Sequence, residues 1–276
     1  MRVAGRLRKF LPFWESLTED HEILEGIAGA KLEFEQIPFQ SKPQGEIYCS
    51  VEEKHAVDVE VAKYLELGII EAVEHEEEEF VSKIFPRLKK NGKLRIILDL
   101  SVLNLDIKYE HFKMESLGCA TNLMSPGCYF SSLDLKDAYY SVSIHPTQRK
   151  YLRFSWNSQL YEFTCLPNVY TGAPRLFTKI MKPIFGKLRS EGLVSVFYLE
   201  YSLLIGASFD ECKENTIKTA ELLSKAGFIL NAEKSVVVPT QEIQFLGFIL
   251  NSNDMTIRLP EQKLRNNQFG VLCFIN

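Results

Sequence analysis

The stretch VSVFYLEYSLLIGAS, residues 194–208, consists of two apolar runs, 194–199 and 202–205, that are separated by Glu200 and Tyr201. Two runs of β-branched and aromatic residues with a polar break between them predict a β-hairpin. The break contains neither Asn-Gly nor another glycine pair, although two-residue hairpin loops strongly favour such pairs. A glutamate and a bulky tyrosine at a hairpin tip therefore need an explanation other than turn formation.

The composition is that of a globular chain. Its 276 residues are 46% hydrophobic and 25% charged, so the length allows one large domain or two smaller ones. The formal net charge is −4 at pH 7. Nucleic-acid binding therefore cannot be inferred from the overall charge and would require a local basic patch.

The six cysteines lie far apart and form no C-x-x-C pair, which argues against a structural zinc site. The N-terminal residues do not resemble a secretory signal, and no uncharged apolar run approaches the ~20 residues that a membrane helix needs. We therefore expect reduced cysteines and an intracellular location, in the cytoplasm or the nucleus.

Helix and strand signals alternate along the chain without regular βαβ units, which predicts an α+β fold. Helical spacing precedes Gly68, spans residues 173–189, and runs from a capping box at Ser208 and Glu211 to Ala226. The last stretch, residues 265–276, shows no partner for strand pairing. Strands are predicted from residue 69, at 94–100 after the turn Asn91-Gly92, from 129, on both sides of Asn157-Ser158, at 194–205, at 235–238 and at 243–250.

Two acidic residues, Asp134 and Asp137, stand near the end of a predicted strand in LDLKDAY, residues 133–139. Acidic residues at strand ends often only begin a turn, and the residues alone leave this alternative open. If this strand lies beside the 194–208 hairpin, Asp134 and Glu200 would repel one another unless a divalent cation lay between them. Paired carboxylates on neighbouring strands are typical of two-metal phosphoryl transfer.

Five blocks, in order and at compatible spacings, resemble a reverse transcriptase, specifically the polymerase domain of a DIRS- or gypsy-like retroelement. The resemblance covers about residues 6–263 and implies a right-hand polymerase fold with fingers and palm. The blocks are FVSKIFPRLKKNGKLRIILDLSVLN (80–104), HFKMESL (111–117) with SSLDLKDAYYSVSIHPTQRKYLRFSW (131–156), LYEFTCLPNVYTGAPRLFTKIM (160–181), KAGFILNAEKS (225–235) and QFLGFIL (244–250).

The resemblance also implies a domain organisation. It places an N-terminal arm at residues 1–50 and fingers at 51–128, to which residues 146–170 return. The palm then occupies residues 129–258, and residues 259–276 form a truncated thumb or a tail. The implied partners are an RNA or DNA template-primer and deoxynucleoside triphosphates, and the implied activity is that of an RNA-directed DNA polymerase, a nucleotidyltransferase.

In this family, the palm carries three metal-binding aspartates, two of them adjacent in a Tyr-x-Asp-Asp hairpin. Asp134 matches the first aspartate, and the carbonyl of Leu135 matches an additional metal contact. Tyr198 matches the hairpin tyrosine, so the other two catalytic positions fall on Glu200 and Tyr201. The resemblance thus explains the unusual tip as a degenerate catalytic hairpin in which both acids have been replaced.

Both replacements are expected to weaken the binding of the two Mg²⁺ ions that the family uses. Glu200 extends its carboxylate by one C–C bond, roughly 1.5 Å, whereas Mg²⁺ demands octahedral coordination at about 2.0–2.1 Å. The phenol of Tyr201, with an ordinary pKa near 10, offers no charge at neutral pH. The remaining metal contacts would be Asp134, the Leu135 carbonyl and Glu200, and we expect strongly impaired polymerisation.

Five further positions match residues that bind the nucleotide in this family. Arg95 matches an arginine that contacts the triphosphate, and Lys93 belongs to the basic turn beside it. Tyr139 matches the aromatic residue that would clash with a ribose 2′-hydroxyl, and Lys234 matches a lysine near the departing pyrophosphate. Asn168 lies in Pro-Asn-Val, where the family has Pro-Phe-Gly or Pro-Gln-Gly. An ordinary surface or core residue is the open alternative for these positions.

Three interpretations of function are compatible with the sequence. The chain is an RNA-directed DNA polymerase with a two-metal mechanism, a non-catalytic domain that binds nucleic acid or protein, or the product of a decayed element without selected function. The acidic run at residues 74–79 is expected to face solvent, because clustered like charges are usually solvated.

Overall fold

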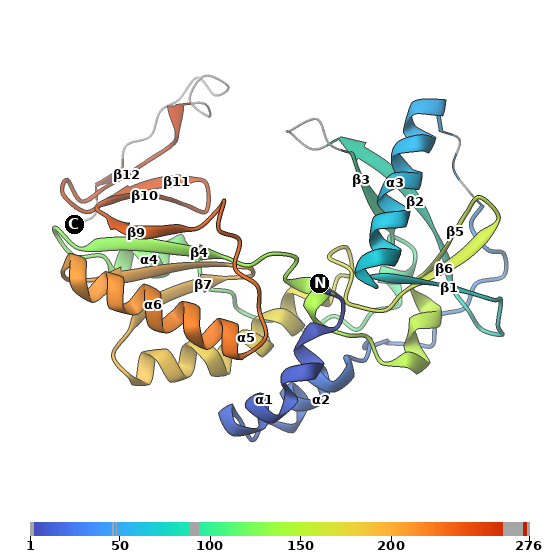
Figure 1. Ribbon diagram of the computed structural model, residues 1–276, viewed down its shortest axis with the longest axis horizontal. Coiled ribbons are helices and arrows are strands. Elements are labelled where there is room, and N and C mark those ends of the chain that lie inside the picture. Colours follow the sequence, from blue (N-terminus) through green and yellow to red (C-terminus); the bar gives the residue numbers. More distant parts are fainter. Residues whose placement is uncertain (1–2, 46, 48, 89–93, 262–272, 275–276) are drawn as a thin grey trace. The chain divides into compact units, whose positions relative to one another are not determined.

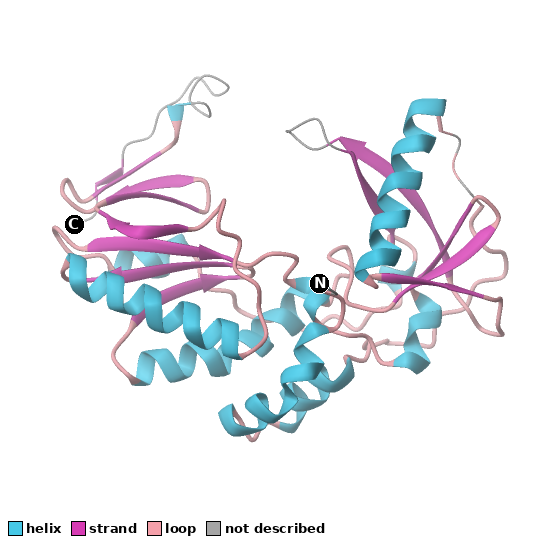
Figure 2. Ribbon diagram, in the orientation of Figure 1, coloured by secondary structure: helices cyan, strands magenta, loops and turns pink. Residues whose placement is uncertain are grey.

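A computed structural model of the protein describes residues 3–45, 47, 49–88, 94–261 and 273–274 (Figures 1 and 2). The chain divides into two compact units. The first unit consists of Met1–Phe112 and Asp137–Ile180, and the second consists of Lys113–Lys136 and Met181–Asn276. The predicted turn at Asn91-Gly92 lies outside the described residues. The mixture of helices and sheets confirms the α+β fold class.

The first unit contains a five-stranded sheet with the order β1-β6-β5-β2-β3. Its strands are β1 (Ile70–Val73), β2 (Val81–Leu88), β3 (Leu94–Asp99), β5 (Arg153–Trp156) and β6 (Gln159–Phe163). The turn between β5 and β6 is where the sequence predicts it, because Asn157 and Ser158 both adopt left-handed conformations, with φ of 50° and 62°. Two such residues are the geometry of a tight hairpin turn.

The helices of the first unit have clear terminal signals. Helix α3 begins after Ser50, which forms a capping box with Glu53, and it ends at Gly68, whose φ is 70°. Both ends therefore follow from local sequence. The helices are α1 (Leu11–Leu17), α2 (His21–Gly29) and α3 (Val51–Leu67), with short 3-10 helices at η1 (Arg6–Phe10), η2 (Leu103–Leu105), η3 (Tyr139–Ser141) and η4 (Pro146–Tyr151); helix α5 (Ala173–Ser190) begins in this unit and ends in the second.

The second unit is built on a four-stranded sheet with the order β7-β8-β4-β9, whose strands include the predicted hairpin. Helix α6 packs against β8, β4 and β9, and helix α4 contacts β7 (Figure 1). The elements are α4 (Leu117–Leu123), β4 (Tyr129–Asp134), β7 (Val194–Tyr198), β8 (Tyr201–Gly206), α6 (Phe209–Lys225) and β9 (Val236–Thr240).

One apolar cluster of the second unit joins this sheet to a second one. It contains buried residues from the turn after α4, from β4, β7 and β8 of the β7-β8-β4-β9 sheet, and from β10 and β11. Phe130, Leu203 and Phe245 are among them. The second sheet has the order β10-β11-β12-β13. Its strands are β10 (Glu242–Phe245), β11 (Phe248–Asn251), β12 (Thr256–Arg258) and β13 (Cys273–Phe274).

Three expectations about the ends and the pairing of helices and strands need correction. The hairpin turn consists of Leu199, with φ of 56°, and Glu200, whereas Tyr201 is already the first residue of β8. At the start of α6, Glu211 accepts a hydrogen bond from the N–H of Ala207, so the capping box is only half formed. The C-terminal stretch was expected to lack a pairing partner, but β13 within it pairs with β12.

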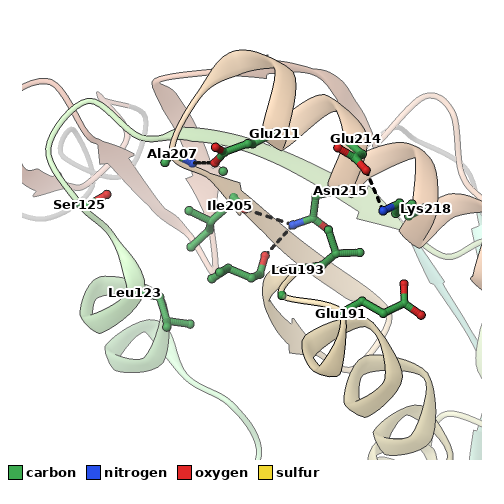
Figure 3. A pocket seen from close by; sticks show the side chains of 13 residues that line it. Leu123, Ser125, Glu191, Leu193, Ile205, Ala207, Glu211, Glu214, Asn215 and Lys218 are labelled. Atoms are coloured by element: carbon green, nitrogen blue, oxygen red, sulfur yellow. Dashed lines mark hydrogen bonds and ion pairs between the residues drawn. The ribbon is translucent and has the colours of Figure 1, made fainter.

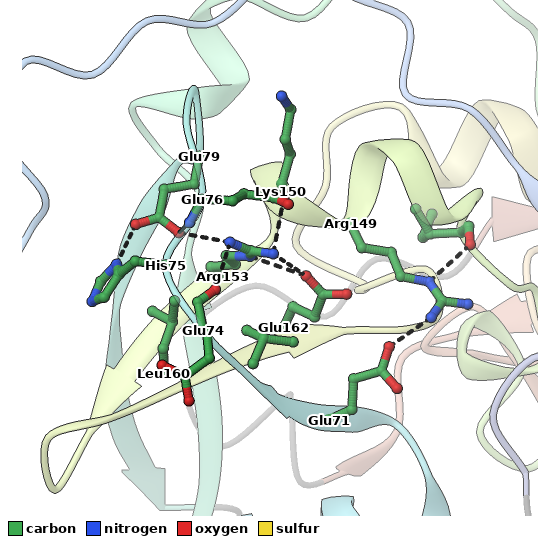
Figure 4. A network of polar contacts seen from close by, with 12 residues as sticks. Glu71, Glu74, His75, Glu76, Glu79, Arg149, Lys150, Arg153, Leu160 and Glu162 are labelled. Carbon is green, nitrogen blue, oxygen red and sulfur yellow. Dashed lines mark hydrogen bonds and ion pairs between the residues drawn. The ribbon is translucent and has the colours of Figure 1, made fainter.

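The expectation that the acidic run faces solvent is wrong for Glu79. Its side chain is only 11% exposed and forms an ion pair with Arg153, at 2.7 Å (Figure 4). Arg153, itself 4% exposed, also pairs with Glu162 at 2.9 Å. A buried guanidinium requires carboxylate partners, and this requirement turns the end of the run inward.

No helix in the described part of the chain is long and apolar enough to cross a membrane.

Candidate active site

The candidate site lies where β4 ends beside the β7–β8 hairpin, within the second unit. Strands β4 and β8 pair in antiparallel fashion, which confirms that the strand of Asp134 neighbours the hairpin. The residue directly opposite Asp134 is Tyr201. Glu200 lies in the turn, where its carbonyl accepts a hydrogen bond of 2.9 Å from the N–H of Leu135. Antiparallel pairing thus brings these four positions together.

Asp134 is 6% exposed and is held by the turn at residues 231–235. Its Oδ1 accepts a hydrogen bond of 3.0 Å from Nδ2 of Asn231 and lies 3.8 Å from Nζ of Lys234. Its backbone N–H donates to Oγ of Ser235 at 3.0 Å, and its carbonyl accepts from the N–H of Asn231 at 2.8 Å. Burial raises the pKa of Asp134 above its ordinary value, although Lys234 and Asn231 oppose this effect.

Tyr201 directs its side chain toward the second sheet. Its hydroxyl donates to the carbonyl of Gln244 at 3.1 Å, and its ring stacks on Phe245 with centroids 5.7 Å apart. This placement follows from strand alternation, since Tyr201 shares a face of β8 with Leu203 and Ile205, which line the apolar cluster. Burial raises the pKa of Tyr201, so the phenol is uncharged at neutral pH.

The other predicted site residues belong to the first unit. Tyr139 is the first residue of η3 and packs against Phe177, with ring centroids 5.0 Å apart. Asn168 is exposed in the connection between β6 and α5. Arg95 lies in β3 opposite Arg87 of β2, and Lys93 lies outside the described residues. The nucleotide-binding roles of these residues stay predictions.

Residues 88–250 match the family model described as "Reverse transcriptase (RNA-dependent DNA polymerase)". The chain belongs to the reverse transcriptase family. Among its curated relatives, it is 24% identical to the Gag-Pol polyprotein of woolly monkey sarcoma virus over 212 residues, which are 73% of this chain and 12% of that protein. It is 28% identical to the Pro-Pol polyprotein of simian foamy virus type 3 over 168 residues, which are 60% of this chain and 14% of that one.

Solved reverse transcriptases share the fold. The foamy viral protease-reverse transcriptase in complex with dsDNA has a TM-score of 0.74 at 21% identity, over 94% of this chain and 53% of that one. The same protein in complex with an RNA/DNA hybrid has a TM-score of 0.72 at 18% identity, over 94% of this chain and 37% of that one. This domain therefore has the right-hand polymerase fold. The finer assignment to a DIRS- or gypsy-like element and the subdomain boundaries stay predictions.

The donors at this site of the reverse transcriptase domain do not match a two-magnesium site. Within the part of the chain that the structure describes, no three side chains of His, Cys, Asp or Glu are grouped so that they could hold a metal ion. Mg²⁺ requires several oxygen ligands in octahedral geometry. Here an ammonium and an amide approach one oxygen of Asp134, and the tyrosine at position 201 packs into the apolar cluster.

Two residues of the site were not predicted. Asn231 and Ser235 contact Asp134, yet only Lys234 of this turn was expected to be functional. An asparagine after the apolar run 228–230 is a typical turn signal. That signal predicts the turn but gives no indication that the turn contacts β4.

A pocket of about 350 Å³ lies at the other end of the β7–β8 hairpin (Figure 3). Val194 and Ile205, which pair at that end, line it together with α6. Nδ2 of Asn215 donates to the carbonyls of Val194 and Ile205, at 2.8 and 3.1 Å, and so joins α6 to both strands. The predicted site residues do not line this pocket.

Proposed function

We propose that this reverse transcriptase domain, which comes from a retroelement or retroviral Pol protein, descends from a two-metal RNA-directed DNA polymerase and has strongly impaired activity. The observation that carries the proposal is the tyrosine at position 201, which packs on Phe245 where the resemblance expects an acid. Of the three acidic positions, only Asp134 retains an aspartate.

Weak magnesium binding is the proposed cause of the impairment. In the family, two Mg²⁺ ions supply the charge that stabilises the transferred phosphoryl group. In this chain, Asp134, the carbonyl of Leu135 and Glu200 would be the contacts for such ions. A misplacement of about 1 Å can by itself cost on the order of 100-fold in rate, and Glu200 carries its carboxylate farther from the backbone than an aspartate does.

The proposed partners are an RNA or DNA template-primer and deoxynucleoside triphosphates. Support comes from the structural relatives, which were solved with dsDNA and with an RNA/DNA hybrid. Arg95, Lys93, Tyr139 and Asn168 are the proposed nucleotide contacts. A non-catalytic domain that still binds such duplexes is the alternative function, and the shared polymerase fold favours it over a domain without any nucleic-acid role.

Primer extension on an RNA template tests the proposal. We expect no extension by the natural chain above that of Asp134→Asn, with either Mg²⁺ or Mn²⁺. Extension that depends on a divalent ion and is lost in Asp134→Asn would show that the proposal is wrong. The double variant Glu200→Asp/Tyr201→Asp restores the family's acids, and any extension that it gains identifies these two positions as the cause of the impairment.

A further inference from the structure

We infer that Asp134 acts in this chain as a structural anchor for the turn at residues 231–235, with Lys234 as its counter-ion, and no longer as a metal ligand. This inference rests on the proposed function, because it gives the first metal-binding position a different role. It concerns a contact that the resemblance does not imply, since Asn231 and Ser235 have no role among the residues carried over.

The turn at residues 231–235 forms hydrogen bonds with both the backbone and the side chain of Asp134. Asn231 contributes two of the bonds, from its N–H to the carbonyl of Asp134 and from Nδ2 to Oδ1. Ser235 accepts from the N–H of Asp134 and donates to the carbonyl of Asn231 at 2.8 Å, which closes the turn on itself. These bonds hold the backbone of Asp134 and one oxygen of its carboxylate, Oδ1, without an added cation.

The pairing of β4 with β9 explains why an anchor is needed there. The register between the two strands shifts between the pairs Phe130–Thr240 and Ser132–Val236. Near this irregularity, hydroxyl groups serve as acceptors, since Oγ of Ser132 accepts from the N–H of Val236 at 3.4 Å and Oγ of Ser235 accepts from Asp134. The contacts of Asp134 therefore fix the point at which the chain enters β9.

The charge at this position also disfavours a second cation. Nζ of Lys234 lies 3.8 Å from the same oxygen that Asn231 contacts. A divalent ion on that oxygen would be repelled by the ammonium, and it would have to displace the amide hydrogen bond. The hairpin residue directly opposite Asp134 supplies no anionic ligand, because it is a tyrosine whose hydroxyl already donates to Gln244.

Urea unfolding of the full chain in EDTA tests the anchor role. We expect Asp134→Ala and Asn231→Ala each to raise the unfolding equilibrium constant by about 5- to 150-fold, because Asn231→Ala leaves the buried Asp134 carboxylate unsatisfied and Asp134→Ala leaves the half-buried Asn231 amide unsatisfied. The double variant is expected to lose little more stability than either single variant, since each single variant already removes the contact between Asp134 and Asn231. Asp134→Asn should retain most of the stability, because its amide oxygen still accepts from Asn231. Glu233→Ala, which removes an exposed carboxylate from the same turn, serves as the matched control and should have no effect.

The same unfolding measurement with millimolar Mg²⁺ or Mn²⁺, at matched ionic strength, tests the absence of a metal role. A ligand that binds only the folded state stabilises it. Because we infer that no metal ion binds at Asp134, the urea midpoint of the natural chain should not change when Mg²⁺ or Mn²⁺ is added. A saturable rise in the midpoint that Asp134→Asn abolishes would overturn the inference. Additive effects of Asp134→Ala and Asn231→Ala would overturn it as well.

Primer extension with the same preparations separates this inference from the proposed function. Extension by the natural chain together with strong coupling between Asp134 and Asn231 would refute the impairment and leave the anchor role standing. Absence of extension together with metal-dependent stabilisation would refute the anchor role and leave the impairment standing.

Discussion

Tyr201 is the residue that the proposed function places where the family has a catalytic aspartate. An aspartate at this position could neither donate to the carbonyl of Gln244 nor stack on Phe245, and the tyrosine does both. It therefore links the hairpin to the second sheet through the apolar cluster of the second unit. The position that the resemblance assigns to metal binding is a packing position in this structure, so replacement of Tyr201 by aspartate is expected to lower stability.

Substitutions of Tyr201 are expected to separate the contribution of its hydrogen bond to Gln244 from that of its ring contact with Phe245. Tyr201→Phe loses one hydrogen bond and should lower the free energy of unfolding by about 0.5–1.5 kcal/mol. Tyr201→Asp also loses the ring contact and places a charge beside Phe245, so it should cost about 2 kcal/mol or more. Urea unfolding measures both values, with Tyr198→Phe as the control from the opposite strand of the hairpin. Equal stability of Tyr201→Asp and the natural chain would contradict this account.

Among the elements, strand β5 and the acidic segment before β2 depend on one buried arginine. Arg153 pairs with Glu79 and Glu162 and also with Glu76, at 3.0 Å. Burial opposes ionisation of Glu79, but hydrogen bonds from His75 and Arg153 outweigh it and lower the pKa of Glu79. The part of this attachment that Glu79 contributes therefore exists only while Glu79 is ionised.

The stability contributed by Glu79 is expected to depend on pH. Because its pKa is lower in the folded than in the unfolded state, the unfolded state binds more protons in that range, and stability rises with pH there. The stability that Glu79 contributes is complete above the ordinary glutamate pKa of about 4.3. It is lost as the pH falls through the lowered pKa of Glu79 in the folded state. Unfolding curves of Glu79→Gln and the natural chain should therefore differ at neutral pH and converge in acid. A difference that stays constant with pH would show that Glu79 acts by packing alone.

At the scale of the whole molecule, the chain has the polymerase fold and carries a net charge of −4. It spans 12% of the Gag-Pol relative and about half of the solved foamy viral chain, 53%. Binding to a nucleic-acid duplex must then depend on a few local cations, because the overall negative charge of the chain repels phosphates. The resemblance assigns Arg95 and the neighbouring Lys93 to the triphosphate of an incoming nucleotide, and we propose that Arg95 also contacts a phosphate of the duplex.

Binding to an RNA/DNA hybrid is expected to weaken as salt increases, because bound phosphates release counterions. Arg95→Ala should reduce the slope of the logarithm of affinity against that of salt concentration by about 1, as for the loss of one phosphate contact. Fluorescence anisotropy over a salt series measures the slope, with Lys213→Ala on the exposed face of α6 as the control. An unchanged slope for Arg95→Ala would remove Arg95 from the set of phosphate contacts.

The sequence by itself determined the local features and the family. The ends of α3 and the tight turn at Asn157-Ser158 follow from capping and turn residues, and the β7–β8 hairpin follows from two apolar runs with a polar break between them. The order of the five blocks identified the reverse transcriptase family and predicts that Glu200 and Tyr201 stand where the family has aspartates. These features can be predicted because each depends on residues that lie close together in the sequence.

Only the tertiary structure decided which side chains meet. Tyr201 lies opposite Asp134 and packs on Phe245, the turn at 231–235 holds Asp134, and Arg153 draws in Glu79. Each of these contacts joins strands or turns that are distant in sequence. A shift of strand register by one residue reverses the face of every side chain, and no local pattern specifies that register.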